Sequence, residues 1–353
     1  MPDILVVNAG STSLKLHLVD GDEHAVRLEN FAGVPAGIEG VAHRVVHGGD
    51  RFRDPVVIDA SVRNQIAELV ELAPLHNAPA LEAIESAQDA FPRVPHVAVF
   101  DTSFHRSIPV EAAAYAVPRR WREEWGVRRY GFHGLSIAWS VERVPRIVGR
   151  TVRRLVVCHL GGGSSVTAVV DGKSRDTTMG FSPLEGVPMT TRSGSLDPGA
   201  LLYVLHTHTP DVATVEHELN FESGLKALAG GSGEMIEVER RADTGDADAS
   251  LALDVYLYRL ATAIGAMAAA AGGIDALVFT AGIGENSVVV RERVCGRVGF
   301  LGLELDHERN RAAEPDCDVA TPGSGGRIVV VRAREELVAA RAARTVLASV
   351  GWQ

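Results

Sequence analysis

Residue types that bind carboxylate and phosphate groups recur in short loops rich in glycine and proline. Arg44 and His47 lie in HRVVHGG, Asp101 opens DTSFHRSIP, His133 lies in YGFHG and Arg192 lies in MTTRSGSLDP, while LAPLHNAP is a fifth such loop. A histidine in one loop more often has a structural role than a catalytic one, but five such loops are harder to explain by packing. Arginine forks suit carboxylate and phosphoryl oxygens alike, so the loops indicate a site for an anionic ligand.

A second feature is a pair of turns built from small residues, each between two apolar runs. The stretch LVVNAGSTSLKLHLVDG covers Leu5 to Gly21, and the similar LVVCHLGGGSSVTAVVDG covers Leu155 to Gly172. The first turn also carries the donors Asn8, Ser11, Ser13 and Lys15. Turns so poor in side chains expose backbone N–H groups that can form a nest for phosphate. Neither is a P-loop, because GxxxxGK[ST] is absent. Two related halves that clamp one nucleotide would explain the repeat, and chance is the alternative.

A third candidate element is IDALVFTAGIGENSVVVRERV, from Ile274 to Val294. We expect a strand that ends in Gly-Ile-Gly, followed by a helix that begins near Asn286 or Ser287. Glycines let a flat ring approach the backbone, and a helix N-terminus favours an anion. Taken alone, an ordinary strand-to-helix turn explains this stretch equally well.

Strands and helices are expected to alternate around these loops, which favours an α/β fold. The predicted strands are 4–8, 14–19, 41–46, 97–100, 154–159, 166–170, 276–280 and 327–331. The predicted helices are 61–72, 78–91, one from about 198 to 206, 250–272 and 335–350. Residues 230–248 are expected to form a surface loop, and 75–76 lie in a loop bounded by prolines. A length of 353 residues favours two domains.

Composition excludes several classes of protein. Apolar content of 46% and charged content of 23% are ordinary for a globular chain, and a net charge of −10 argues against general nucleic-acid binding. The 3 cysteines form no CxxC pair, so no disulfide framework or zinc site is expected. No signal peptide is recognised, and the longest uncharged run, 260–274, is too short to span a bilayer. We expect a cytoplasmic protein.

The motifs taken together resemble one known family. NAGSTSLK, HRVVHGG, LAPLHN, FDTSFH, YGFHG, DTTMGFSPLEG, TRSGSLDP, FTAGIGENS and REELVAAR occur in this order along nearly the whole chain. They resemble the motifs of the acetate kinase (acetokinase) family, part of the superfamily of acetate and sugar kinases, heat-shock protein 70 and actin. So many ordered motifs are highly specific, and chance no longer explains the repeat.

The resemblance implies a fold of two duplicated actin-like (ribonuclease H-like) domains with a nucleotide cleft between them. Residues 1–102 and 333–353 would form the first domain, with the loops for magnesium, phosphate and the acyl group. Residues 103–332 would form the second, which binds the nucleotide and dimerises. The reaction implied is Mg²⁺-dependent (or Mn²⁺-dependent) phosphoryl transfer from ATP to acetate, giving acetyl phosphate and ADP in a homodimer.

Site residues carry over onto the matching positions. The resemblance implies catalytic roles for Arg44, Asp101, His133 and Arg192, and metal binding by Asn8 and Glu335. It implies nucleotide or phosphate contacts from Ser11, Ser13, Lys15, His159, Gly161, Gly162, Gly163, Glu234, Gly282, Ile283, Gly284, Glu285 and Asn286. It implies an acyl pocket lined by Val46, Leu75, His76, Phe132 and Pro183. In this pocket acetate is the expected acid and propionate a slower one, because one methylene is worth only about 1–3 kcal/mol.

The chain departs from the family pattern mainly around the nucleotide. HLGGG replaces HLGNG, so Gly162 stands in place of an amide donor, and SGEMIE replaces SSDMRE, with Glu234 and Ile236 at the changed positions. Leu135 and Ile137 also replace polar residues. These changes suggest altered selectivity for the phosphoryl donor, with another nucleoside triphosphate or pyrophosphate as alternatives; compensated drift is the other explanation.

Three readings from other classes stay open at this point. A sugar kinase would need a catalytic carboxylate to deprotonate a hydroxyl group. An actin-like or chaperone-like switch would hydrolyse ATP slowly without acetate. A degenerate, non-catalytic kinase would not need the arginines and His133, which are retained.

Overall fold

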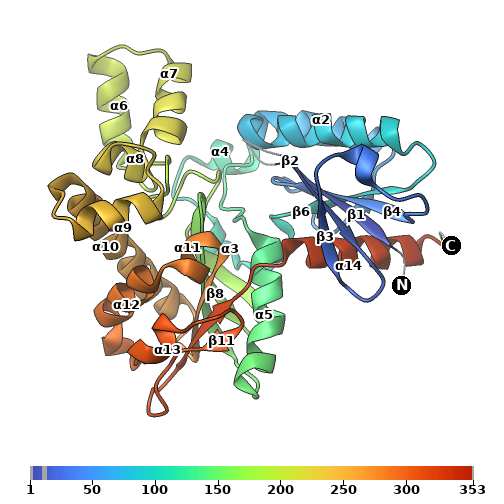
Figure 1. Ribbon diagram of the computed structural model, residues 1–353. Coiled ribbons are helices and arrows are strands. Elements are labelled where there is room, and N and C mark those ends of the chain that lie inside the picture. Colours follow the sequence, from blue (N-terminus) through green and yellow to red (C-terminus); the bar gives the residue numbers. More distant parts are fainter. Residues whose placement is uncertain (1–2, 10–13, 352–353) are drawn as a thin grey trace. The chain divides into compact units, whose positions relative to one another are not determined.

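The computed structural model describes residues 3–9 and 14–351 (Figure 1). The described chain forms two compact units. Unit 1 takes its residues from Met1–Arg106, Phe132–Trp139 and Arg334–Gln353, and unit 2 from Ser107–Gly131 and Ser140–Ala333. The domain limits proposed at 102 and 333 stay a prediction.

Unit 1 is built on a mixed sheet of six strands in its described residues, in the order β3-β2-β1-β4-β6-β5. These strands are β1 (Ile4–Ala9), β2 (Leu14–Val19), β3 (Ala25–Leu28), β4 (Gly40–Val45), β5 (Val56–Val57) and β6 (His96–Phe100). β1, β4 and β6 run parallel, with Asn8 opposite Arg44 and Arg44 opposite Val99. Because the central strands are covered on both faces, they read as nearly continuous apolar runs.

Unit 2 is built on a second sheet, also of six described strands, in the order β11-β12-β10-β7-β8-β9. These are β7 (Arg154–Leu160), β8 (Ser164–Val170), β9 (Lys173–Thr177), β10 (Ala276–Thr280), β11 (Cys317–Asp318) and β12 (Arg327–Val331). Here β7, β10 and β12 are the parallel strands.

The two sheets share one topology. In each, three antiparallel strands begin the sheet, two parallel strands follow, and a short antiparallel strand closes the edge. β1 and β2 correspond to β7 and β8, which are the strands of the repeated sequence. The predicted duplication within an α/β fold is therefore confirmed.

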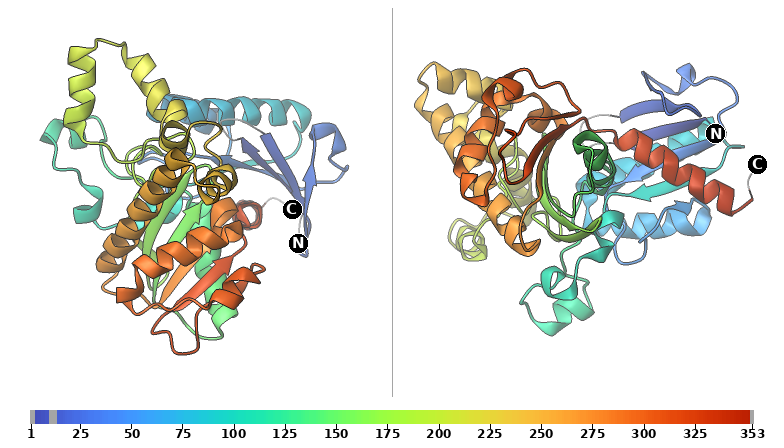
Figure 2. Two further views of the ribbon diagram at one scale, coloured as in Figure 1. Left: turned by 60° about the vertical axis from the view of Figure 1, so that its left-hand side comes forward. Right: turned by 90° about the horizontal axis from the view of Figure 1, so that it is seen from below.

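Two helices cover the sheet of unit 1. Figures 1 and 2 show α2 (Pro74–Ala90) along one face and α14 (Glu335–Ser349) along the other. The remaining helical segments of the unit are η1 (Phe31–Gly33), α1 (Ala60–Glu68), η2 (Leu69–Leu72), η3 (Ser103–Ser107) and the first half of α5 (Gly134–Val148). The C-terminal helix α14 thus lies in the same unit as the N-terminal strands.

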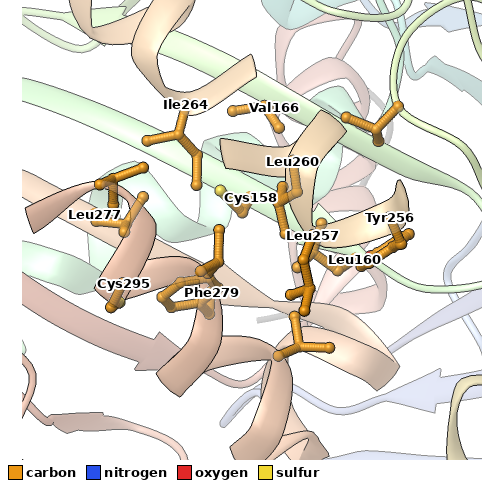
Figure 3. Packing of buried hydrophobic residues seen from close by; sticks show 14 of the residues in the cluster. Cys158, Leu160, Val166, Tyr256, Leu257, Leu260, Ile264, Leu277, Phe279 and Cys295 are labelled. Atoms are coloured by element: carbon orange, nitrogen blue, oxygen red, sulfur yellow. The ribbon is translucent and has the colours of Figure 1, made fainter. Parts of the chain in front are cut away.

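The core of unit 2 forms around the long helix α10 (Ala247–Ala270). Tyr256, Leu257, Leu260 and Ile264 of this helix are buried against side chains of β7, β8 and β10, among them Cys158 and Phe279 (Figure 3). By length and hydropathy alone α10 could cross a membrane, but one face of it forms this core. It therefore acts as the central core helix of unit 2.

The other helices of unit 2 are shorter. They are α3 (Val110–Ala113), α4 (Arg119–Glu123), α6 (Pro198–Thr207), α7 (Val212–His217), η4 (Glu218–Glu222), α8 (Gly224–Ala229), α9 (Met235–Asp243), α11 (Ala281–Asn286), α12 (Val288–Arg297), η5 (Gly299–Leu301) and α13 (His307–Arg311). Asp197 caps α6 by accepting a hydrogen bond from the backbone N–H of Gly199 (2.8 Å), which confirms the helix start expected there.

The surface loop expected at 230–248 is wrong, because α9 occupies its centre. Gly230 and Gly245 lie in turns on either side of this helix, and these glycines favoured a loop. The helical spacing of the buried residues Met235 and Val238 was therefore overlooked.

The sheet of unit 2 yields a first prediction. Phe279 is fully buried in β10, whereas Phe300 in η5 is 79% exposed. We expect Phe279→Ala to lower the free energy of unfolding by about 3–5 kcal/mol through a cavity in this core. Phe300→Ala, the matched control, should change it by less than about 0.5 kcal/mol. Urea unfolding followed by circular dichroism measures both, and equal losses would contradict this description of the core.

Candidate active site

Polar side chains of unit 1 gather where its parallel strands end. Asn8 lies at the end of β1, Arg44 at the end of β4, and Asp101 directly follows β6. Parallel strands bring their carboxyl ends to one edge of a sheet, which is the usual place for ligands in open α/β sheets. Glu335, the first residue of α14, reaches the same edge.

Arg44 is the centre of this group. Its Nε lies 3.0 Å from each oxygen of Asp101, a second nitrogen of its guanidinium also bonds that carboxylate, and its Nη1 donates to Asn8 Oδ1 (3.0 Å). Glu335 lies 3.9 Å from Nε. Burial lowers the pKa of Arg44, but the charges of Asp101 and Glu335 outweigh it, and the pKa rises above its ordinary value. The arginine therefore stays a fixed cation.

Asp101 also positions His133. The carbonyl oxygen of Asp101 accepts from the backbone N–H of Gly134 (2.9 Å), and a Cβ on Gly134 would overlap that oxygen. His133 itself has a left-handed backbone with φ of 60°, which is uncommon for a residue other than glycine. Strained backbone of this kind often marks a functional position, and here it places His133 at the start of α5.

A braced loop follows β4 and carries Val46, one residue of the predicted acyl pocket. Asn77 of α2 accepts from the backbone N–H of His47 (3.1 Å) and donates to its carbonyl (2.9 Å). The His47 ring meets the Phe132 ring edge to face, with centroids 5.5 Å apart. The carbonyl of Phe132 accepts from His105 Nε2 (2.8 Å). Val46 and Phe132, two of the predicted pocket residues, are both buried.

The expected loop around Leu75 and His76 is wrong, because both residues lie in the first turn of α2. Pro74 occupies the first helical position, where its missing N–H costs nothing, and Pro79 follows one turn later. Two prolines so close together suggested a loop, yet a proline in the first turn starts a helix. The half-buried Leu75 and His76 precede Asn77, which holds the His47 loop.

In unit 2 the second glycine turn meets the short helix α11. The backbone N–H of Gly161 donates to the carbonyl of Gly163 (3.0 Å), so residues 161–163 form a tight turn after β7. A Cβ on Gly161 would lie 3.7 Å from the Cβ of Ala281, at the start of α11. His159, which is buried, is paired in register with Thr280 of β10. The structure thus brings together the two elements predicted for the nucleotide.

The Gly-Ile-Gly segment differs from expectation, because it is helical. α11 spans Ala281–Asn286, and the helix expected near Asn286 is α12, capped by Ser287. Ser287 also bonds Glu239 of α9, and Asn286 Nδ2 donates to the Gly282 carbonyl (2.8 Å). Burial raises the pKa of Glu239.

A buried arginine holds the end of α11. Arg291 is 1% exposed and donates to the carbonyls of Gly284 (3.0 Å) and Glu285 (2.7 Å), and to both oxygens of Asn310. Glu285 in turn accepts from the backbone N–H of Ala333 (2.9 Å), at the point where the chain leaves unit 2. The carboxylate of Glu285 therefore has a structural partner.

Arg192 and Pro183 lie in one long segment without regular structure, residues 178–197. Arg192 Nη1 is 3.4 Å from the carbonyl oxygen of Pro183 and can donate to it. Burial lowers the pKa of Arg192. Its backbone is fixed by Gly224, whose left-handed backbone packs closely against the carbonyls of Met189 and Arg192.

The positions that depart from the family pattern are open. Glu234 precedes α9 and is exposed, and Ile236 is 80% exposed, the largest exposed fraction among the large apolar side chains described. No atom lies within 4 Å of a Cβ built on Gly162. By contrast, Leu135 and Ile137 are buried in α5, where apolar side chains fit.

In the first glycine turn, Ser11 and Ser13 lie outside the described residues. Lys15 is exposed on β2 and is paired in register with Asn8 across the hairpin.

Metal binding rests on few side chains. In residues 3–9 and 14–351, no group of three or more His, Cys, Asp and Glu side chains lies close enough to hold a metal ion. Asn8 and Glu335 both lie around the guanidinium of Arg44. One amide and one carboxylate oxygen fit Mg²⁺, which keeps waters and takes other ligands from phosphates.

Sequence reasoning missed the polar residues that brace these loops. They are Asn77, Arg129, Glu185, Glu239, Arg291 and Asn310. Arg291 could have been recognised from the sequence, because it lies on the same helix face as the buried apolar residues Val290 and Val294.

A model of the acetokinase family matches residues 24–341. The chain belongs to the acetokinase family. The acetate kinase of Protochlamydia amoebophila is 45% identical over 306 residues, 86% of this chain and 76% of that protein. The acetate kinase of Nostoc punctiforme is 47% identical over 301 residues, 85% and 74% of the two chains.

Solved structures agree with this family. A propionate kinase from Francisella tularensis superposes with a TM-score of 0.92 at 34% identity, covering 98% of this chain and 100% of that one. An acetate kinase from Porphyromonas gingivalis superposes with a TM-score of 0.87 at 32% identity and the same coverage. These matches support the duplicated actin-like fold expected for an acetokinase.

A buried histidine pair lies behind Arg44 in the same sheet. His43 of β4 lies 2.9 Å from His96 of β6 (Nε2 to Nδ1), and the rings stack. His96 Nε2 donates to the Phe91 carbonyl (3.2 Å), so its Nδ1 accepts from His43 and both rings are neutral. His43 Nδ1 has no partner in the described part of the chain. Burial lowers the pKa of both histidines.

This pair predicts acid sensitivity. The folded pKa values lie below the unfolded value of about 6.5, so the unfolded chain binds more protons as pH falls. The stabilisation is complete above about pH 6.5 and decreases below it, by up to about 1.4 kcal/mol per pH unit for each histidine. We expect the double variant His43→Leu/His96→Leu to flatten the dependence of unfolding free energy on pH between 7 and 5. The exposed control His206→Leu should keep the slope, and an unchanged slope in the double variant would refute the assignment.

Proposed function

We propose that this protein is an acetate kinase that transfers a phosphoryl group reversibly between ATP and acetate, giving acetyl phosphate and ADP. The observation that carries the proposal is the array of Asn8, Asp101 and Glu335 around Arg44, in a chain that belongs to the acetokinase family. Relatives named acetate kinase cover most of this chain at 42–47% identity.

The chemistry does not need a general base. A short carboxylic acid is already ionised at neutral pH, and the obstacle is the approach of two anions. Both oxygens of Asp101 are bonded to Arg44, and the side chain is fully buried. This carboxylate therefore suits orientation of the arginine better than proton abstraction, which supports phosphoryl transfer to a carboxylate over the hydroxyl chemistry of a sugar kinase.

The arginines would supply the stabilisation that the reaction needs. Phosphoryl transfer depends chiefly on positioning and on electrostatic stabilisation of charge in the transition state. Arg44 would bind the carboxylate or the moving phosphoryl group while Asp101 holds its guanidinium plane. Arg192 would bind the other side of the same groups. His133 would donate a hydrogen bond to the phosphoryl oxygens.

The remaining residues would hold the substrates. Val46, Leu75, His76, Phe132 and Pro183 would surround the methyl group of acetate. Lys15, Ser11, Ser13, His159 and Gly161–Gly163 would bind phosphate, and Glu234 with Gly282–Asn286 would lie near the base and sugar. Asn8 and Glu335 would hold Mg²⁺, which neutralises phosphate charge when it is bound.

Propionate is a second candidate acceptor. The Francisella tularensis structure that superposes with a TM-score of 0.92 is named a propionate kinase. Acetate remains the proposed substrate because the sequence relatives cited above are named acetate kinases. A homodimer in the cytoplasm is also proposed, on the resemblance alone.

The proposed function is tested by trapping acyl phosphate with hydroxylamine. Purified protein with ATP, Mg²⁺ and acetate should give hydroxamate that depends on acetate, and propionate should react more slowly. Absence of hydroxamate with either acid, from protein shown to be folded, would overturn the proposal. Slow ATP hydrolysis without acetate would then favour a nucleotide switch.

The arginines give a mutational prediction in the same assay. Arg44→Ala and Arg192→Ala should each lower kcat by about 10²–10³ or more, as expected when one donor to a developing charge is lost. Arg259→Ala, on the exposed face of α10, is the control and should keep normal turnover. Near-normal turnover in either test variant would remove that arginine from the mechanism.

Donor selectivity gives another prediction. The open positions at Gly162 and Ile236 predict weak discrimination between ATP and GTP, and pyrophosphate serves as the third donor to compare. A strong preference for ATP would contradict this prediction.

The variant Gly162→Asn tests whether the missing amide donor at this position causes the weak discrimination. The backbone there is not left-handed and there is room for a side chain. One added hydrogen bond of about 0.5–1.5 kcal/mol should lower the KM for ATP about 2- to 10-fold and leave the KM for acetate unchanged. Gly296→Asn on α12, which also has open space, is the matched control.

A further inference from the structure

Residues 178–197 carry two of the proposed site residues, Pro183 and Arg192, without a helix or strand to hold them. Irregular segments of this length in a compact fold are usually functional, and they need side-chain bonds to keep one conformation. In this segment one carboxylate, that of Glu185, provides such bonds.

Both oxygens of Glu185 are used. Arg129 Nη2 donates to Oε1 (2.9 Å), and the hydroxyl of Tyr115 donates to Oε2. The same hydroxyl accepts from the backbone N–H of Phe181 (3.0 Å). Burial, followed by the bond to Glu185, raises the pKa of Tyr115, so the hydroxyl remains a donor over the ordinary pH range.

Arg129 also binds the backbone at the start of the segment. Its Nη1 donates to the carbonyls of Thr177 (2.5 Å) and Thr178 (3.2 Å), and its guanidinium lies over the Tyr115 ring. The next residue, Tyr130, donates its backbone N–H to the carbonyl of Gly180 (3.0 Å). One arginine therefore fixes both the entry of the segment and Glu185.

The segment closes on this carboxylate. A Cβ on Gly180 would overlap Glu185 Oε2 and the hydroxyl oxygen of Tyr115, so only glycine permits the approach. Gly186, directly after Glu185, exchanges hydrogen bonds with Ser195: its N–H donates to Ser195 Oγ (3.1 Å), and its carbonyl accepts from the Ser195 N–H (2.8 Å). The bonds between Gly186 and Ser195 thereby join the stretch that contains Pro183 to the stretch that follows Arg192.

We propose that Glu185, held by Tyr115 and Arg129, is a positioning residue that sets the place of Pro183 relative to Arg192. In this way it sets the selectivity of the site between acetate and a longer carboxylate. The inference rests on the proposed function, in which Pro183 borders the acyl group and Arg192 binds the reacting anions. Glu185 does not touch substrate in this account; it acts through the carbonyl of Pro183, to which Arg192 Nη1 lies within hydrogen-bond distance.

The test compares the full-length variants Tyr115→Phe, Glu185→Gln and Glu185→Ala with the original protein. Tyr115→Phe and Glu185→Ala should raise the KM for acetate about 10-fold and raise the propionate-to-acetate ratio of kcat/KM about 3- to 10-fold, a change typical of one methylene in a loosened pocket. The KM for ATP should stay within about 2-fold. Glu185→Gln, which keeps an acceptor oxygen, should recover part of the acetate KM.

The controls separate this inference from a general structural role. Tyr258→Phe removes a hydroxyl from a side chain that is 56% exposed on α10 and should behave as the original protein. Melting temperatures identify loss of folded protein, which would lower turnover with both acids equally. An unchanged propionate-to-acetate ratio in folded Tyr115→Phe and Glu185→Ala would overturn the inference and leave the proposed function standing. No hydroxamate from the original protein would overturn both.

Discussion

The buried ion pair between Arg44 and Asp101 is the interaction on which the rest of unit 1 depends. It joins the ends of β4 and β6, and Asn8 and Glu335 extend it to β1 and α14. A buried charge without its partner is costly, so loss of either Asp101 or Arg44 would leave the other uncompensated. The same aspartate fixes the backbone of His133, and one constraint therefore orients most of the polar groups of this edge.

The duplicated fold carries two different kinds of chemistry on one topology. The strand ends of unit 1 carry charged side chains such as Arg44 on β4, whereas β10 of unit 2 ends in Thr280. The strand ends of unit 2 are occupied by glycine and backbone, from Gly161–Gly163 to α11. Phosphate can be bound by backbone N–H groups, whereas carboxylate activation needs side-chain cations. Under the proposed function, this division of tasks accounts for the divergence of the two halves.

The sequence allowed the strands, the repeat and the long helices to be predicted, because their signal is local. Apolar runs such as Ile4–Ala9 and the Asp197-Pro198 helix start need no tertiary information. The first turn of α2 and the helix α9 were missed because prolines and glycines have the same appearance at a helix end and in a loop. The left-handed backbone of His133 could not be foreseen either, since it depends on Asp101, which is remote in sequence.

The braces of the site follow one rule that explains why they were invisible in the sequence. Each segment of the candidate site is held by a polar side chain from another segment: the His47 loop by Asn77, residues 178–197 by Tyr115 and Arg129, and α11 by Arg291. Such bonds gain strength from burial, and burial is set by the whole fold. An irregular segment held by such bonds can then keep one conformation without a helix or strand. The residues that hold these segments in place are therefore separate from the residues that are proposed to react.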